Sequence, residues 1–529
     1  MAFKLSAGSL TKAIRHVCKY GDTDVFPHLP ELIFLHEQEA DVVAELANLD
    51  LDVYTPDTAI EALAPKSRFG FRLVHQLPVI DTVLLLAAVI EIGASIEAKR
   101  LDITFSYRFG PDNAGAVFKP NHTYREWLSS QQKLIQGNLK IKAVVATDVS
   151  DFYSRVNFHR LENLLNQVAQ GHGAVRFIKK HIRIIRATQS FGLPVGGSAA
   201  RLLAELALAD VDTALSHTPY LATRFVDDFR IFLKAGEEPY EALAFLAEQL
   251  GINEGLALNV AKTRVFTRAE YVEHLKELLT ELTDQAEGQA FAELTSHLYF
   301  DDEPDPEELE KLKNVNLLGL LQEEVGKEAY DIGRIKLIFR ALRITKPQEA
   351  IPYIGENFSE LVVFAKDVVL LMQALEGEYL VPFNNLGDKV VDTILKPPAL
   401  SIQLVKSWLL ELFVRGTVPL SPVGLKKLEV LTSPLDRRQL LLIRGRMNLQ
   451  NYFRMQKGAF GQFSSIEKYC LIWGAACLPE DEHQKWLDFI KALFSVPCGT
   501  IFLKWARKNR GKLFQKLGAP IEDNQEDPL

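Results

Sequence analysis

The stretch Arg224-Phe225-Val226-Asp227-Asp228-Phe229-Arg230 decides the fold. It places two adjacent acids between two short apolar runs, residues 222–226 and 229–233, which predicts a β-hairpin with the acids at its tip. Adjacent carboxylates repel each other, and a bound cation relieves that repulsion. An Asp-Asp pair alone is more often part of an exposed loop, so the surrounding sequence has to decide between the two interpretations.

A third acid lies upstream, in Thr147-Asp148-Val149-Ser150-Asp151-Phe152-Tyr153. This acid, Asp148, lies near the end of the β-branched run 143–149, which predicts a buried strand, and a charged, unpaired carboxylate there costs several kcal/mol. Two Mg²⁺ ions about 3.5–4 Å apart would compensate the acids, activate an attacking hydroxyl and stabilise a leaving pyrophosphate. Mg²⁺ prefers oxygen ligands, and Mn²⁺ is an alternative ion. The simpler alternative is that Asp148 or Ser150 caps the helix that follows.

Two further motifs follow in order along the chain. Phe191-Gly192-Leu193-Pro194-Val195-Gly196-Gly197 predicts a turn that opens a helix, and Leu258-Asn259-Val260-Ala261-Lys262-Thr263 predicts a short segment carrying a lysine. Each motif is weak by itself. Their succession is informative: a strand-borne Asp, a glycine-rich turn before a helix, an Asp-Asp hairpin and then a lysine.

This succession resembles the palm of reverse transcriptases over roughly residues 70 to 270. Residues 192–205 and 224–230 resemble the bacterial abortive-infection and defence-associated branch of that family. The resemblance implies an α+β palm-and-fingers fold at residues 1–285, followed by an all-α helical-repeat domain at 286–529. It also implies an RNA-directed DNA polymerase type of nucleotidyltransferase that acts in antiviral phage defence. Some members of this branch make DNA without a template and prime it from one of their own hydroxyl side chains.

The resemblance assigns roles to residues. Asp148 and Asp227 would hold both metals together with the Val149 carbonyl, and Asp228 would ligate more loosely. The residues expected to contact the nucleotide are Arg108, Val149, Asp151, Tyr153, Gly192, Pro194, Gly196 and Lys262. Tyr153 would exclude a 2′-hydroxyl and so select deoxynucleoside triphosphates, with Phe152 facing the core.

Several of these residues have simpler interpretations. These are a core tyrosine for Tyr153, a plain turn for the glycines and Pro194, a solvated side chain for Lys262, an exposed salt bridge for Arg108 and a helix cap for Asp151.

One departure from the family pattern bears on the activity. Val195 stands where many reverse transcriptases have a glutamine, which puts templated copying in doubt. The expected product is DNA, covalently attached to the protein if a tyrosine primes it, with Tyr452, Tyr20 and Tyr54 as candidates and RNA as a further partner. The alternatives are a nucleic-acid or protein-binding scaffold without polymerase activity, and an RNA polymerase, which Tyr153 disfavours.

Composition limits the classes of protein to which this chain can belong. The chain has 529 residues, 47% hydrophobic and 24% charged, with a net charge of −8. The four cysteines have neither zinc nor disulfide spacing, which favours a cytoplasmic protein with reduced thiols. No segment is expected to span a bilayer, since residues 79–94 include Asp81 and Glu91. A homo-oligomer is expected. Two basic stretches, 176–186 and 504–516, are either nucleic-acid contacts or solvated helix faces.

The spacing of apolar residues predicts helices through the first hundred residues and a strand at 101–107. A second small strand pair is predicted at 256–259 and 264–266, and an acidic linker at 301–306. From residue 307 to 516, amphipathic helical segments follow one another, which predicts a helical-repeat array although no clean sequence period is visible.

Overall fold

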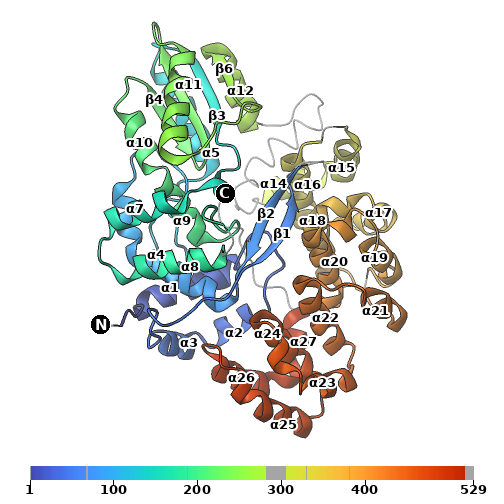
Figure 1. Cartoon of the computed structure of the whole chain (residues 1–529). Coiled ribbons are helices and arrows are strands. Elements are labelled where there is room, and N and C mark those ends of the chain that lie inside the picture. The colour runs from blue at the N-terminus through green and yellow to red at the C-terminus, as the bar shows by residue number, and fades with distance from the viewer. Residues whose placement is uncertain are drawn as a thin grey trace.

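The computed structural model describes residues 2–66, 70–186, 189–280, 306–328, 330–380 and 382–518. A mixed N-terminal half lies beside an all-helical half, with a two-stranded hairpin between them (Figure 1). Most of the expected linker and the expected domain boundary at 285/286 lie outside the described residues. Pro306, the last residue of that linker, begins helix α14 (Pro306–Lys313).

A four-stranded antiparallel sheet organises the N-terminal half. It consists of β3 (Ile141–Asp148), β4 (Leu221–Phe225), β5 (Asp228–Lys234) and β6 (Arg264–Thr267), in the order β4-β5-β3-β6. The central strands β3 and β5 are largely buried, which explains their apolar composition. The strands predicted on either side of the paired acids, and the strand before Asp148, are therefore confirmed.

Of the second small strand pair, residues 264–266 are confirmed as part of β6, but the predicted pairing with residues 256–259 is wrong. Residues 264–267 pair with β3, and Leu258 forms a single bridge with Val149 just beyond the end of β3. Both segments satisfy the open edge of β3 and its extension, whose backbone groups would otherwise lack partners.

The long helix α4 (Val79–Lys99) forms the centre of the N-terminal half. It packs against α1 (Ala7–Tyr20), α8 (Gly173–Ile185) and α9 (Ser198–Ala207). Contrary to the sequence prediction, α4 is long and apolar enough to cross a membrane by length and composition. However, 78% of its most apolar stretch is buried inside the protein, which accounts for that composition.

Residues 101–107 do not form the predicted strand. They run beside β4 for one bridge only, between Thr104 and Arg224, where the Phe105 N–H donates to the Arg224 carbonyl at 2.9 Å. Tyr107 then adopts a left-handed conformation with φ 46°, which ends any extended run. A hairpin that was not predicted, β1 (Ile60–Pro65) with β2 (Phe71–Gln76), interrupts the helical pattern of the first hundred residues.

The remaining helices of this half are α2 (Glu31–Glu37), α3 (Glu39–Leu46), α5 (Tyr124–Gly137), α6 (Phe152–Arg155), α7 (Phe158–Val168), α10 (Ala209–Ser216), α11 (Pro239–Glu248) and α12 (Arg268–Thr280).

The C-terminal half is an array of helices, and residues 306–518, where described, contain no strand. Its inner helices each pack on the next: α16 (Ile332–Thr345), α18 (Ala365–Glu378), α20 (Gln403–Arg415), α22 (Pro434–Arg446), α24 (Ser465–Gly474) and α26 (Gly499–Asn509). A second series of helices alternates with them: α17 (Ala350–Asn357), α19 (Gly387–Ile394), α21 (Pro422–Leu428), α23 (Gln450–Gln456) and α25 (Glu480–Ile490).

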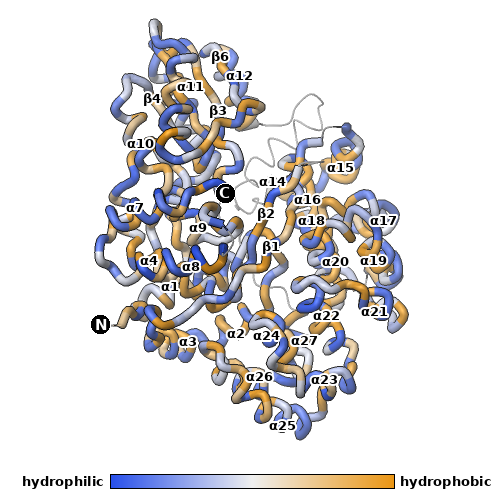
Figure 2. Tube along the Cα trace, viewed as in Figure 1, coloured by the Kyte–Doolittle hydropathy of each residue, from blue (hydrophilic) through white to orange (hydrophobic). Residues whose placement is uncertain are grey.

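This array has a local period that the sequence pattern did not reveal. Helices α20, α22 and α24 begin at residues 403, 434 and 465, so each begins 31 residues after the one before. Apolar stretches recur between polar ones along the array (Figure 2). The described part of this half is therefore an all-helical array, which agrees with the predicted helical character of the second half.

Candidate active site

The pairing of β3 with β5 brings the acidic residues together. Asp148 is the last residue of β3, Asp228 is the first of β5, and the two are directly opposed across the antiparallel pair. Opposed residues project from the same face of a sheet. The Val149 N–H also donates to the Asp227 carbonyl at 3.1 Å, so the two acidic segments are joined by backbone.

These carboxylates carry excess negative charge. Burial, with the fields of Asp228 and Asp148, raises the pKa of Asp227 to about 7. Burial also raises the pKa of Asp228, against the opposing effect of Arg230, whose Nη1 lies 3.6 Å from an Asp228 oxygen. The cluster therefore favours either protons or an added cation at neutral pH.

A lysine supplies part of that positive charge. Lys262 Nζ lies 2.6 Å from Asp148 Oδ2. Partial burial lowers the pKa of Lys262, but the hydrogen bond with Asp148 and the nearby acids outweigh it, so the pKa is raised overall. Asp148 Oδ1, by contrast, is buried without a hydrogen-bond partner. The lysine thus neutralises one side of the Asp148 carboxylate and leaves the other available.

The chemistry of this set fits Mg²⁺, because carboxylate and carbonyl oxygens are its preferred ligands and it retains several waters. The unpartnered Asp148 Oδ1 and the raised pKa of Asp227 both indicate a place for a cation. In the described part of the chain, no three His, Cys, Asp or Glu side chains already converge as a closed metal cage. Asp148, Asp227 and the Val149 carbonyl are the groups that would hold the ion.

The turn that carries the acids has an unusual backbone. Val226 adopts φ 52°, a left-handed conformation that is rare for a β-branched residue. Its peptide groups are held on both sides: the Val226 N–H donates to Ser106 Oγ at 2.8 Å, and Arg224 Nη1 donates to the Val226 carbonyl at 2.5 Å. Ser106 and Arg224 therefore fix the conformation that presents Asp227.

A buried charge network lies beneath this turn, and the sequence analysis did not find it. Arg224 pairs with Asp212 at 2.5 Å and with Glu205 at 3.0 Å, and Arg100 pairs with Glu205 at 2.9 Å. All four side chains are almost fully buried. A usable signal was present, since an arginine inside an apolar strand must have acidic partners.

Tyr153 lies close to the acids and to the glycine-rich turn. Its carbonyl accepts from the Leu193 N–H at 2.7 Å, and the field of Asp227 reaches its hydroxyl. Burial is the main cause that raises the pKa of Tyr153 well above its ordinary value. Phe152 faces the core as expected, with an exposed fraction of 2%. The structure thus brings Tyr153, the turn and the acids together.

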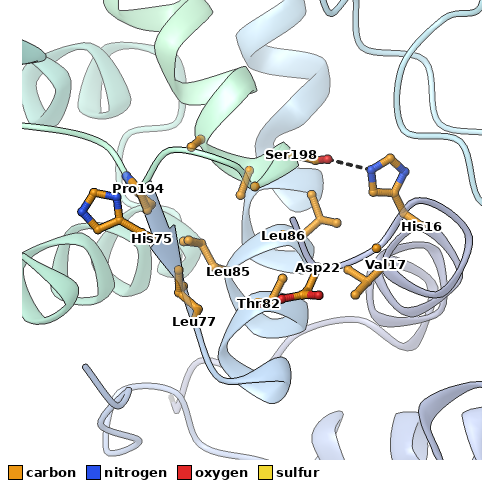
Figure 3. A pocket seen from close by; sticks show the side chains of 14 residues that line it. His16, Val17, Asp22, His75, Leu77, Thr82, Leu85, Leu86, Pro194 and Ser198 are labelled. Atoms are coloured by element: carbon orange, nitrogen blue, oxygen red, sulfur yellow. Dashed lines mark hydrogen bonds between the residues drawn. The ribbon is translucent and has the colours of Figure 1, made fainter. Parts of the chain in front are cut away.

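The glycine-rich turn packs closely against protein. Gly192 has φ +93°, and a Cβ there would lie 3.1 Å from the Ser154 carbonyl. Pro194 is buried and lines a small cavity of about 30 Å³, which has space for a water molecule. In Figure 3 His75 lies beside Pro194, and the His16–Ser198 hydrogen bond lies on another side of the same cavity. Gly196 packs against Thr23.

Arg108 and Asp151, both expected to contact the nucleotide, have different surroundings. Arg108 is engaged by the Glu97 carboxylate at 2.6 Å and by the Leu101 carbonyl at 2.9 Å, which places it in an ion pair that is mostly buried. Asp151 stands at the N-cap position of α6 but makes no capping hydrogen bond. Its exposed carboxylate lies 4.0 Å from Lys66, at the end of the β1–β2 hairpin. Lys66 is a cation beside the site that the sequence analysis missed.

The first basic stretch is occupied by contacts within the protein. Arg176 pairs with Asp52 at 3.1 Å, and Arg183 pairs with Glu162 at 2.6 Å. Within the second stretch, Arg507 pairs with Asp488 at 2.5 Å. These partners explain much of the positive charge without a nucleic acid.

The candidate priming tyrosines lie in different parts of the protein and have contacts of their own. The Tyr54 hydroxyl donates to Asp81 Oδ1 at 2.7 Å, and Tyr452 lies on α23, at the opposite end of the molecule from β3 and β4 (Figure 1). The Tyr20 ring contacts His16, with 4.8 Å between ring centroids. The four cysteines are free thiols, in agreement with the sequence prediction.

No protein-family profile and no curated protein match this sequence. Solved structures that match include apo telomerase from Candida tropicalis, with 12% identity, a TM-score of 0.33 and coverage of 71% of this chain and 74% of that chain. Telomerase from Candida albicans in complex with the TWJ fragment of telomeric RNA also matches, with 10% identity, a TM-score of 0.31 and coverage of 71% and 70%. These TM-scores are too low to assign a fold or a function to this chain.

Proposed function

We propose that the chain is a two-metal nucleotidyltransferase, a reverse-transcriptase-like DNA polymerase whose palm is the four-stranded sheet. The observation that carries this proposal is the register of β3 and β5. It opposes Asp148 to Asp228, with Asp227 beside them and Lys262 paired to Asp148. Three acids at one end of a sheet, two of them with raised pKa, suit the binding of divalent cations.

Each residue near the acids has a task in this proposal. Asp148, Asp227 and the Val149 carbonyl would hold two Mg²⁺ or Mn²⁺ ions, with Asp228 as a looser ligand. When bound, these ions activate an attacking hydroxyl and neutralise the leaving pyrophosphate. Lys262 would neutralise or protonate that pyrophosphate.

The nucleotide itself would lie over Tyr153, whose ring would disfavour a 2′-hydroxyl. On the triphosphate side, Lys66 is a better placed cation than Arg108, because it reaches Asp151 while Arg108 is occupied by Glu97.

The experiment is incubation of the full chain with labelled deoxy- or ribonucleoside triphosphates and Mg²⁺ or Mn²⁺, without primer and then with primer and template. Asp227→Ala with Asp228→Ala should abolish incorporation and leave the fold intact, while Asp102→Ala, at an exposed turn, should retain it. Equal activity of the double variant and the wild type would refute the two-metal proposal.

Membership of the defence-associated branch is a further part of this proposal. It is supported by the sequence resemblance of residues 192–205 and 224–230, together with a helical array following the sheet. Covalent self-priming is proposed on the same resemblance. Protease treatment should then change the migration of the DNA product, and unchanged migration would rule out covalent self-priming.

A binding scaffold without catalysis is the second candidate. It is favoured by one observation: the ion pair with Lys262 neutralises part of the charge on Asp148. A chain that binds RNA or DNA but incorporates neither type of nucleotide under all the conditions above would support this candidate.

A further inference from the structure

The helical array and the glycine-rich turn are linked by one short segment. Residues 22–27, here called the strap, form neither helix nor strand. On the side of the sheet domain, the Asp24 N–H donates to the Gly196 carbonyl at 3.4 Å, and Arg201 Nη2 donates to Asp24 Oδ2 at 3.1 Å. The contact is close, since a Cβ on Gly196 would lie 2.7 Å from Thr23 Oγ1.

The opposite side of the strap is held by the array. Lys366 Nζ on α18 donates to the Asp24 carbonyl at 2.8 Å, and Trp408 Nε1 on α20 donates to the Val25 carbonyl at 2.8 Å. The Trp408 side chain is buried, with an exposed fraction of 6%. Two successive inner helices thus each donate a hydrogen bond to the strap backbone.

A third inner helix reaches the strap through one intermediate. Arg438 Nη1 on α22 donates to Gln76 Oε1 at 2.6 Å, and Gln76 Nε2 donates to Asp22 Oδ2 at 2.9 Å. All three side chains are buried. Asp22 also lines the small cavity beside Pro194, on the far side from His75 (Figure 3). The strap is thus fixed at its first residues as well as at its centre.

We infer that the helical array positions the glycine-rich turn through the strap, with Lys366 and Trp408 as positioning residues. A segment without regular structure depends on such contacts for its position, and the turn has the strap as its immediate neighbour at Gly196. The inference rests on the proposed function in one respect: the turn is taken to support the incoming nucleotide. Nucleotide affinity should therefore depend on side chains of the array that never touch the nucleotide.

A matched pair of double variants tests this inference. Lys366→Met with Trp408→Phe removes both donors to the strap and retains most of the side-chain volume. Lys389→Met with Trp486→Phe makes the same two changes inside the array, where Lys389 donates to the Gly355 carbonyl at 2.6 Å and Trp486 to the Phe453 carbonyl at 3.1 Å. The control therefore loses similar hydrogen bonds without touching the strap.

The first measurement is amide hydrogen exchange of the full chain at residues 22–27 and 192–198, which requires no catalysis. We expect exchange in both segments to accelerate about tenfold in the strap variant and to stay unchanged in the control, as the loss of two hydrogen bonds predicts. If the strap variant does not fold, Trp408→Phe alone should accelerate exchange about threefold. Faster exchange in the strap with an unchanged turn would overturn the inference.

The second measurement separates this inference from the proposed function. If the chain incorporates nucleotides, the strap variant should raise the nucleotide KM about tenfold and change kcat much less, because the acids themselves are not disturbed. An unchanged KM in an active enzyme would refute the inference. If the wild type incorporates nothing, the proposed function fails, and the exchange result alone decides whether the array positions the turn.

Discussion

Replacing Asp227 with asparagine should abolish activity and at the same time make the folded protein more stable near neutral pH. The reason is the raised pKa of Asp227, about 7 against an ordinary value of 3.8. A carboxyl group with a raised pKa in the folded state binds its proton more tightly there than in the unfolded chain. The folded state therefore loses stability as the pH rises from about 4 through 7. Asparagine is neutral and escapes this loss.

The size of this stability difference follows from the pH range over which the folded and unfolded states differ in protonation. Between pH 5 and pH 7 the folded protein holds a proton on Asp227 that the unfolded chain has released, and each pH unit is worth ~1.4 kcal/mol. Two units give ~3 kcal/mol as an upper limit. Asp227 is half-buried, so solvent screening reduces this figure to roughly 1–3 kcal/mol. A change of that size corresponds to roughly 2–10 °C in melting temperature for a domain of this size.

Thermal unfolding in EDTA at pH 5, 6, 7 and 8 measures this difference. The comparison of wild type with Asp227→Asn cancels other buried acids that titrate in the same range, including Asp22, Glu31 and Asp81. We expect the two curves to separate steadily from pH 5 to 7 in favour of the variant, and Mg²⁺ to stabilise only the wild type. Asp102→Asn should follow the wild type. Parallel curves for wild type and Asp227→Asn would refute the proposed accumulation of charge at this site.

Three further predictions concern individual side chains around the acids. Lys262→Met should lower kcat and also lower the Mg²⁺ concentration needed for half-maximal activity, because the ammonium group competes with the ion for Asp148; initial rates across a Mg²⁺ titration measure both. Tyr153→Ala should raise ribonucleotide use relative to deoxynucleotide use in a competition assay, and an unchanged ratio would exclude the ring from the sugar site. Ser106→Ala leaves the Val226 N–H without its partner, so we expect ~1–3 kcal/mol of destabilisation by urea unfolding. It should also reduce kcat more than it changes KM.

The central strands could be predicted because burial on both faces produces a signature in one short stretch of sequence. Residues 143–149 are apolar or β-branched apart from Asp148, and β3 has few other interpretations. The order of motifs then predicted which acids lie together. The opposed pairing of Asp148 and Asp228 agrees with that prediction.

The β1–β2 hairpin could not be predicted from comparable signals. Residues Ile60–Pro65 read Ile-Glu-Ala-Leu-Ala-Pro, and Glu, Ala and Leu are strong helix formers. In β2, burial increases from one end of the strand to the other and does not alternate between faces, so the period-two pattern is absent. The hairpin is stabilised by its position between the two halves of the molecule, which is a tertiary effect.

The buried charge network under the acidic turn illustrates a different limit on prediction from sequence. Arg224 could be recognised as a buried cation from its strand, but its partners Glu205 and Asp212 lie on two separate helices. Nothing in their local sequence distinguishes them from exposed acids on a helix face. Only the packing of α10 against β4, with α9 packed on α10, determines which acids meet the arginine.

The backbone at Val226 helps to distinguish an enzyme from a scaffold. A left-handed position is ordinarily filled by glycine or asparagine, and a non-glycine residue there costs ~1–2 kcal/mol. A hairpin that only had to hold its shape would be more stable with glycine at 226 and with asparagine in place of the half-buried Asp227. The chain has neither, and it surrounds the turn with buried ion pairs that hold the strained peptide in place. Strain retained beside a destabilising carboxylate is expected where that carboxylate must bind a cation, and it has no use in a passive scaffold.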